Sequence, residues 1–343
     1  MRSRSARIPI LLVAVLVVLG LAGPVAAEPQ VCAGAVIEEA FNDLALDGGA
    51  EGVAVANNGD VFFGATWEGV IFKAPHGNFA ATFEFADLVP DGSFGEVIGM
   101  DVDRHGNVYA AVSEPFDDTL HGIWKVDPDG SAMLAAPLPI FFESRPNDIA
   151  IDNRGNVYAS DSFAGRIWRL APDGAVTEWV VDDLLRAFFT FPDGSVFEFG
   201  VNGLTYDRGA LHGAITLDGR IVKIPIRPDG AAGTPELLVE DPSLIGIDGI
   251  ELDRRGNIYV TNNFAQTIQR ITKNSHATET IIENNGAAPL SSPASLALNR
   301  NHKSIYVANL NESGGMVQGD PDNPLLVEVM LPVPVHAWTS DCG

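Results

Sequence analysis

Apolar and polar residues alternate along this chain in short segments that are separated by turn residues. In RPNDIAID (145–152), Ile149 and Ile151 alternate with small or polar residues, as in a half-buried strand. The strand begins, however, with an arginine, an asparagine and an aspartate. Segments with the same period follow at short intervals, without a helical stretch of note. We therefore predict an all-β chain.

The pattern recurs six times at nearly even spacing. The copies are AEGVAVANNGDVFF from Ala50, VIGMDVDRHGNVYA from Val97, PNDIAIDNRGNVYA from Pro146, VNGLTYDRGALHGA from Val201, IDGIELDRRGNIYV from Ile247 and ASLALNRNHKSIYV from Ala294. Their aligned first positions are Glu51, Ile98, Asn147, Asn202, Asp248 and Ser295, which lie 47, 49, 55, 46 and 47 residues apart. An aromatic residue stands later in five copies, and His212 takes its place in the fourth.

Six copies of this length predict a six-bladed β-propeller. One blade is a small sheet that cannot bury both of its faces alone, whereas blades arranged in a ring cover one another. We expect a single propeller domain over residues 28–343. A sandwich or two separate domains would explain the strands but not the even period.

Residues 1–27 have the pattern of a secretory signal peptide. Arg2, Arg4 and Arg7 precede an apolar run from Ile8 to about Ala22, and small residues suited to cleavage lead up to Ala27. The apolar run is shorter than the roughly 20 residues of a membrane span, which favours export over a membrane anchor. We expect a secreted, extracytoplasmic protein that has no membrane attachment after cleavage.

Composition narrows the partners and the chemistry. The formal net charge is −24, so the surface should repel nucleic acid and anionic lipid. This charge suits a cation-binding protein, and it equally suits a protein that is merely soluble. The sequence lacks G-x-S-x-G, H-E-x-x-H, Walker and C-x-x-C motifs, which disfavours serine hydrolases, zinc proteases, P-loop enzymes and thioredoxin-type redox proteins.

Cys32 and Cys342, the two cysteines of the chain, lie near its two ends. Export implies an oxidising compartment, where such a pair tends to form a disulfide. The bridge would require the termini to meet, and it would lock the ring of blades closed.

The first positions of the six copies predict a binding site. In a propeller the first strand of each blade lines the central channel, so these residues should converge on the axis. Glu51, Asn147, Asn202 and Asp248 would form a ring of oxygen donors, which are costly to bury without partners. Calcium, or another divalent cation, fits two carboxylates and two amides, while the absence of His and Cys disfavours zinc. A water-filled polar plug is the alternative.

The chain resembles the gluconolactonase / senescence-marker-protein family of six-bladed propellers. The resemblance rests on EGVAV (51–55), RPNDIAID (145–152), VNGLTYD (201–207) and IDGIELD (247–253), and it spans nearly the whole mature chain. It implies that Glu51, Asn147, Asn202 and Asp248 hold a catalytic divalent metal, usually calcium. It also implies that Arg145 and Asn147 contribute to substrate binding. Paraoxonase, which has a related fold, joins its two ends by a disulfide, as Cys32 and Cys342 would do here.

These features favour a calcium-dependent hydrolase, most of all a lactonase or esterase acting on a small molecule. Asp248 is the candidate base that activates water, and Arg145 would anchor a substrate hydroxyl or carboxylate. Arg145 could instead form an ion pair with Glu143 or Asp148, and Asp148 by itself is typical of a turn. The departures ALHGAIT in copy four and Val97-Ile98-Gly99 in copy two put the substrate in doubt rather than the metal.

Other functions remain open at the level of sequence. The propeller could be a non-catalytic binding module with a structural axial metal, or a phosphotriesterase that uses the same site. His121 and His212 are candidate proton shuttles, although a lone histidine is more often structural. The Phe-rich segment 184–199 should be an insertion in or after blade 3, where it either roofs the site or packs as ordinary core.

Overall fold

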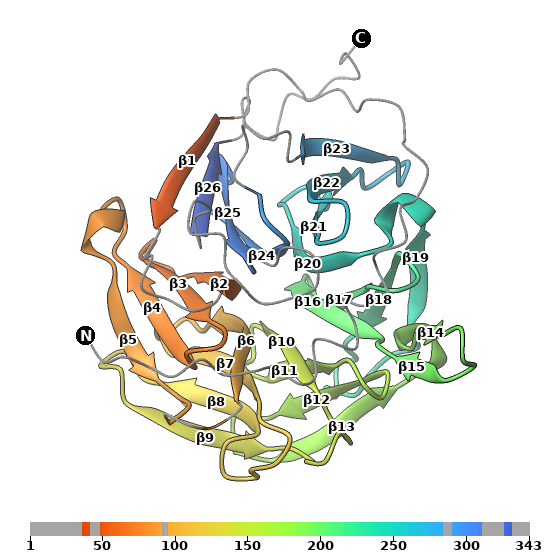
Figure 1. Ribbon diagram of the computed structural model, residues 1–343, viewed down its shortest axis with the longest axis horizontal. Coiled ribbons are helices and arrows are strands. Elements are labelled where there is room, and N and C mark those ends of the chain that lie inside the picture. Colours follow the sequence, from red (N-terminus) through yellow and green to blue (C-terminus); the bar gives the residue numbers. More distant parts are fainter. Residues whose placement is uncertain are drawn as a thin grey trace.

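The computed structural model describes residues 36–41, 49–90, 93, 95–283, 290–310 and 326–330. Within these residues the chain forms six four-stranded antiparallel sheets, which stand around a central axis as the blades of a ring (Figure 1). The predicted six-bladed β-propeller is therefore confirmed. The predicted signal peptide and both cysteines lie outside the described residues.

Each blade is a meander that runs outward from the axis. The inner strands of blades 1 to 6 are β2 (Ala50–Val55), β6 (Glu96–Val102), β10 (Pro146–Ile151), β16 (Val201–Asp207), β20 (Ile247–Leu252) and β24 (Pro293–Leu298). The second strands are β3 (Val61–Ala65), β7 (Val108–Ser113), β11 (Val157–Asp161), β17 (Ala210–Ile215), β21 (Ile258–Asn262) and β25 (Ser304–Asn309). The third strands are β4 (Val70–Ala74), β8 (Gly122–Val126), β12 (Arg166–Leu170), β18 (Arg220–Pro225), β22 (Thr267–Ile271) and β26 (Leu326–Met330).

The outer strands show how the ring closes. In blades 1 to 5 they are β5 (Phe83–Asp87), β9 (Ala132–Pro137), β13 (Val176–Val181), β19 (Glu236–Glu240) and β23 (Thr278–Glu283). Blade 6 takes its outer strand from the other end of the chain, because β1 (Val36–Phe41) pairs antiparallel with β26. Backbone hydrogen bonds between the first and last strands thus hold the ring together. The repeat did not reveal β1, since VIEEAF belongs to none of the six copies.

Three short 3₁₀ helices and one extra hairpin complete the described structure. The helices are η1 (Phe79–Ala81), η2 (Asp183–Leu185) and η3 (Pro242–Leu244). The hairpin pairs β14 (Phe188–Thr190) with β15 (Val196–Glu198), between the last strand of blade 3 and the first strand of blade 4. It lies at the outer rim of the ring (Figure 1), so the Phe-rich insertion does not roof the axis.

The hydrophobic core is divided among the blade interfaces. Each of six clusters joins side chains of two neighbouring blades; Tyr158 of blade 3, for example, packs with Val201 and Leu211 of blade 4. The repeated aromatic belongs to these interfaces, and Phe62, Tyr158, Tyr259 and Tyr306 are all buried. Both faces of most strands are covered, which removes apolar area from water on each side.

Glycines next to the first positions let the inner strands approach closely. A Cβ added to Gly52 would lie 2.2 Å from the Ile98 carbonyl oxygen, and one added to Gly203 would lie 2.1 Å from that of Asp248. Any side chain there would push neighbouring blades apart. The EG, IG, NG and DG pairs of the repeat therefore keep the inner strands close enough to form a narrow axis.

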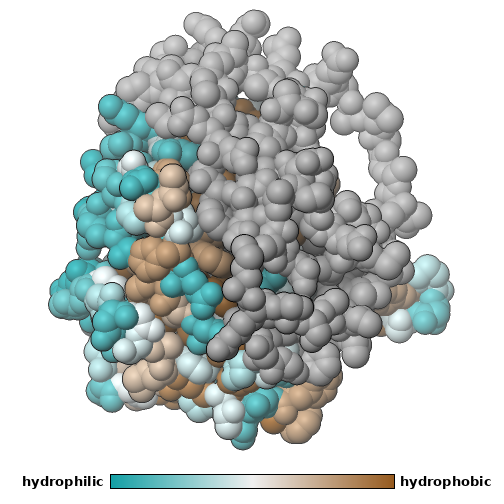
Figure 2. Space-filling view, turned by 60° about the vertical axis from the view of Figure 1, so that its left-hand side comes forward, coloured by the Kyte–Doolittle hydropathy of each residue, from teal (hydrophilic) through white to brown (hydrophobic). Residues whose placement is uncertain are grey.

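Much of the described surface is polar. Figure 2, turned toward the side that carries β1 and β5, shows hydrophilic side chains over most of the described face, with apolar patches between them. None of the helices in the described part of the chain has the length and apolar character that crossing a membrane requires.

Candidate functional site

Every inner strand carries a β-bulge at its start. The register with the second strand shifts between Ala50 and Val53 in blade 1, between Pro146 and Ile149 in blade 3, and at the matching place in blades 2, 4 and 5. In blade 6 it shifts between Pro293 and Ser295, so Ser295 lies just past the bulge instead of within it as the repeat predicted. A bulge adds one residue and re-aims the side chains around it. It explains why RPNDIAID starts with polar residues, because the bulge separates the first position from the apolar alternation that follows.

The face of the ring where the inner strands begin is here called the mouth. Glu51, Asn147, Asn202 and Asp248, the predicted metal ligands, occupy the same bulge on four of the six inner strands, and each is buried with at most 8% of its surface exposed. Since the inner strands surround the axis, the structure places these four residues around the mouth, as predicted from the repeat.

The two asparagines have defined orientations. Asn147 Nδ2 donates to Ser162 Oγ at 3.1 Å, and Ser162 Oγ in turn donates its single proton to the Val201 carbonyl at 3.0 Å. The serine oxygen can therefore only accept from Asn147, which fixes the amide nitrogen toward Ser162 and frees Asn147 Oδ1 to point elsewhere. Asn202 Nδ2 donates to Thr216 Oγ1 at 3.1 Å in the same way.

The oxygen of Asn202 supplies a test of whether a cation fits. Asn202 Oδ1 is buried and has no hydrogen-bond partner among the described residues. An unpaired buried amide oxygen costs free energy unless a donor or a cation meets it. Asp248 Oδ2 accepts from Asn263 Nδ2 at 3.4 Å, so the polar residue that follows the second strand supports this ligand as well. The donor set fits a hard cation that prefers oxygen ligands.

Arg145 lies at the mouth, where it forms an ion pair with a carboxylate. Its Nη1 donates to Glu96 Oε2 at 2.8 Å, and both side chains are almost fully buried. Glu96 and Arg145 stand two residues before the first positions of blades 2 and 3, so the pair links neighbouring blades. The ion pair that was the alternative role of Arg145 is present, but its partner is Glu96, 49 residues away in the chain, instead of Glu143 or Asp148.

The carboxylates at the mouth affect the pKa of Arg145. Burial alone would lower the pKa of Arg145, but the carboxylates of Glu96, Glu51 and Asp248 raise it above its usual value. This coupling places Arg145 among the predicted ligands. Glu96 balances the charge of Arg145, and Glu51 and Asp248 are the two carboxylates of the predicted ligand set.

The two candidate histidines have different positions. His121 precedes β8 on the mouth face, where its Nδ1 accepts the Glu114 backbone N–H at 3.0 Å. Burial lowers the pKa of His121 to about 4, so it is neutral at pH 7 and can donate only from Nε2. His212 lies in β17 toward the opposite face, paired in register with Thr205, where it takes the place of the repeated aromatic. Its position favours a structural role.

Aromatic side chains flank the mouth close to Arg145. Phe116 and Phe142 are exposed and meet edge to face with ring centroids 5.5 Å apart. Phe141 and Phe142 both have positive φ, at 57° and 62°, and the Phe141 N–H bonds to the Pro115 carbonyl. Two consecutive bulky residues in the left-handed region are strained, and such strain is often found beside functional sites.

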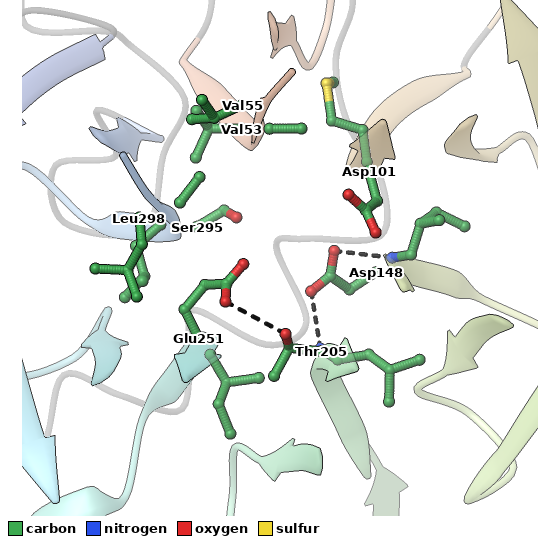
Figure 3. A pocket seen from close by; sticks show the side chains of 15 residues that line it. Val53, Val55, Asp101, Asp148, Thr205, Glu251, Ser295 and Leu298 are labelled. Carbon is green, nitrogen blue, oxygen red and sulfur yellow. Dashed lines mark hydrogen bonds between the residues drawn. The ribbon is translucent and has the colours of Figure 1, made fainter. Parts of the chain in front are cut away.

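A second cluster of polar side chains, which the sequence did not predict, lies further along the axis. Figure 3 shows Asp101, Asp148, Glu251, Thr205 and Ser295 around a cavity of about 80 Å³, here called the axial cavity. Asp148 was expected in a turn, but its Oδ2 accepts the Leu204 N–H of blade 4 at 2.8 Å. Asp101 Oδ2 likewise accepts the Ile151 N–H of blade 3 at 2.9 Å. These carboxylates therefore join neighbouring blades. In the sequence, the feature that could have indicated this cavity is the pair of acidic residues, Asp101 and Glu251, three positions after Ile98 and Asp248.

The axial cavity should make stability depend on pH. Burial raises the pKa of Glu251 to about 8 and that of Asp101 to about 7. The folded chain thus binds protons more tightly than the unfolded chain, so the free energy of unfolding should fall as pH rises from about 4.5 to 8. Glu251→Gln removes the contribution of Glu251 to this loss of stability. We expect the free energy of unfolding of the variant to exceed that of the wild type by a few kcal/mol at pH 8 and to lie closer to it at pH 5.

Urea unfolding in EDTA at pH 5, 6.5 and 8 measures this difference. Glu236→Gln, a change at an exposed strand position, is the control and should leave the pH dependence unchanged. A constant difference between Glu251→Gln and the wild type across the three pH values would contradict the prediction.

No three His, Cys, Asp or Glu side chains within the described ranges gather closely enough to hold a metal. The four predicted ligands include only two residues of these types, so the amides are essential to the proposed set.

Comparison with known proteins supports the fold. No protein-family model and no curated protein matches the sequence. Among solved structures, a gluconolactonase from Xanthomonas campestris is 16% identical with a TM-score of 0.60, and the match covers 87% of this chain and 90% of that chain. A luciferin-regenerating enzyme is 15% identical with a TM-score of 0.58, covering 87% and 95%. A streptogramin B lyase is 17% identical with a TM-score of 0.59, covering 88% and 99%.

The predicted resemblance to gluconolactonase-type propellers is thereby confirmed at the level of the fold. A gluconolactonase and a lyase share this architecture, so the fold does not select the reaction. The chemistry has to be argued from the residues at the mouth.

Proposed function

We propose that the protein is a secreted, calcium-dependent hydrolase that cleaves lactones or related esters of a small molecule. The observation that carries the proposal is the arrangement of amides at the mouth. Asn147 and Asn202 donate from their amide nitrogens to the hydroxyl groups of Ser162 and Thr216, which leaves both amide oxygens for other partners at the mouth, where Glu51 and Asp248 also lie. Secretion rests on the sequence of residues 1–27.

The four residues match calcium in type and charge. Calcium takes six to eight oxygen ligands, so four protein oxygens leave positions for water and substrate. Glu51 and Asp248 together supply the two negative charges that neutralise it. When bound there, the ion would supply a Lewis acid that polarises the substrate carbonyl and stabilises the negative charge on its oxygen.

Asp248 is the proposed base. Its Oδ2 accepts a hydrogen bond from the Asn263 amide, which would orient the carboxylate that receives the proton of the attacking water. The water oxygen adds to the carbonyl carbon, its proton passes to Asp248, and the ester C–O bond then breaks. The same proton goes to the departing alkoxide, so no further reactant is needed. Metal coordination lowers the basicity of this carboxylate, and accurate placement of the water therefore matters more than its pKa.

Arg145 is proposed to anchor a hydroxyl or carboxylate of the substrate. Glu96 holds the guanidinium in place from the neighbouring blade. Phe116, Phe141 and Phe142 stand on the same face, and chain connectivity keeps Phe142 within about 11 Å of Arg145 between Cα atoms. This combination favours a substrate with both a polar and an apolar part.

A panel of aldonolactones and aryl esters tests the proposed function. We expect turnover of at least one substrate, its loss after EDTA treatment, and its recovery with added calcium. Elemental analysis of the purified protein should detect a divalent metal near one per chain. Turnover that is unaffected by complete metal removal would refute the metal mechanism, and a protein that holds calcium without turning over any substrate would be a binding module.

A further inference from the structure

A second cavity lies on the face of the ring opposite the mouth. It has a volume of about 280 Å³ and is bordered by the β2–β3 turn of blade 1 and the β6–β7 turn of blade 2. These turns follow the ends of the inner strands, whose beginnings form the mouth. The cavity, here called the far-face cavity, is therefore separate from the proposed catalytic site.

Two phenylalanines form part of the lining of the far-face cavity. Phe62 and Phe85 line it, and their rings meet edge to face with centroids 5.0 Å apart. Lys73 Nζ lies 5.4 Å from the Phe62 centroid and 5.7 Å from the Phe85 centroid. Pro128 adds another flat apolar surface. A planar ring could stack or pack edge-on against these groups.

The charged groups of the lining have a positive sum in a strongly acidic chain. Lys73, Arg104 and Asp60 line the cavity together with His105, which gives a net charge of +1 when His105 is neutral. Lys73 is already paired with Asp60 at 2.9 Å. The charge of Arg104 is therefore the one left to meet an anion.

Arg104 differs from three other arginines of this face. Arg154 donates to the Pro228 carbonyl of blade 4, Arg254 to the Arg300 carbonyl of blade 6, and Arg300 to the Asn57 carbonyl of blade 1. In the described part of the chain, Arg104 instead bonds only its neighbour, from Nε to His105 Nε2 at 3.1 Å. Arg104 lines the cavity, and no hydrogen bond of its terminal nitrogens to another blade is found among the described residues. A guanidinium of this kind suits a carboxylate.

We propose that the far-face cavity binds a small aromatic acid. Its ring would pack on Phe62, Phe85 and Pro128, and its carboxylate would accept hydrogen bonds from Arg104 at the rim. The volume is at the lower end of ligand-binding cavities and suits one or two rings rather than a nucleotide. A single uncompensated cation also matches a monoanion better than a phosphate dianion. Binding here does not require the reaction proposed at the mouth.

Calorimetric titration of the calcium-loaded protein with phenylacetate tests this site. Acetate lacks the ring and phenylacetamide lacks the charge, so both should bind at least about tenfold more weakly than phenylacetate. Arg104→Ala should weaken phenylacetate binding about tenfold or more. Arg104 is exposed, so this variant should fold normally, which its thermal melt will verify.

Matched variants decide where the probe binds. Arg254→Ala removes an arginine from the equivalent turn of blade 5 and should leave binding within about twofold of the wild type. Phe85→Leu should weaken binding by about fivefold through loss of ring contact. The proposal is overturned if phenylacetate does not bind at about 10 mM, if Arg104→Ala binds it like the wild type, or if Arg254→Ala weakens binding as much as Arg104→Ala.

Discussion

Replacing Asp248 by asparagine should lower kcat/KM for a lactone or ester substrate by about a thousandfold. The amide keeps the size of the side chain, but it removes the proton acceptor and one of the two negative charges proposed to hold calcium. Calcium affinity should therefore fall by more than about tenfold as well. Steady-state kinetics at saturating calcium and a calorimetric calcium titration measure the two effects separately.

The control for this variant lies on the same strand. Glu251→Gln is also a change from a carboxyl group to an amide, but in the axial cavity three residues further on. Its turnover should stay within about twofold of the wild type, because Glu251 is not among the residues at the mouth. If Asp248→Asn keeps its turnover, or if Glu251→Gln loses as much, Asp248 is not the base.

Replacing Arg145 by methionine should destabilise the folded chain by about 3–5 kcal/mol. The change leaves Glu96 buried without its cation, and an unpaired buried carboxylate is far more costly than the pair itself. Glu96→Gln should cost less, because Glu51 and Asp248 still compensate Arg145. The double variant should recover part of the loss caused by Arg145→Met, since no uncompensated carboxylate remains at Glu96.

Urea unfolding at pH 7 in EDTA gives the free energies for this comparison. Lys125→Met is a suitable control because it breaks a more exposed ion pair, between Lys125 Nζ and Asp127 Oδ1 at 2.6 Å. It should cost no more than about 1 kcal/mol. A loss of this small size for Arg145→Met would show that the Glu96 contact contributes little to the fold.

The ring of blades could be predicted because its signals repeat along the sequence. An alternating segment, a Gly-based turn and a buried aromatic recur at nearly even spacing, so each copy supports the interpretation of the others. The first positions Glu51, Asn147, Asn202 and Asp248 were predictable for the same reason, since equivalent positions in a closed ring face the same axis. The bulges that present these side chains also recur in every inner strand.

Features that depend on contacts between blades were not predictable from the repeat. Glu96 is the partner of Arg145 although acids closer in sequence were available, because the two residues occupy equivalent positions on adjacent inner strands. Asp148 resembled a turn residue but bonds to the backbone of blade 4. The far-face cavity likewise combines turns from two blades, and no single segment signals it.

The sequence by itself therefore determined the all-β class, the number of blades and the polar residues at the mouth, because period and alternation are local properties that the chain repeats. Only the tertiary structure decided that β1 completes blade 6, that Glu96 compensates Arg145 and that acids gather in the axial cavity. These outcomes depend on which surfaces meet when the ring closes. That closure sets distances between residues far apart in the chain, which no local pattern records.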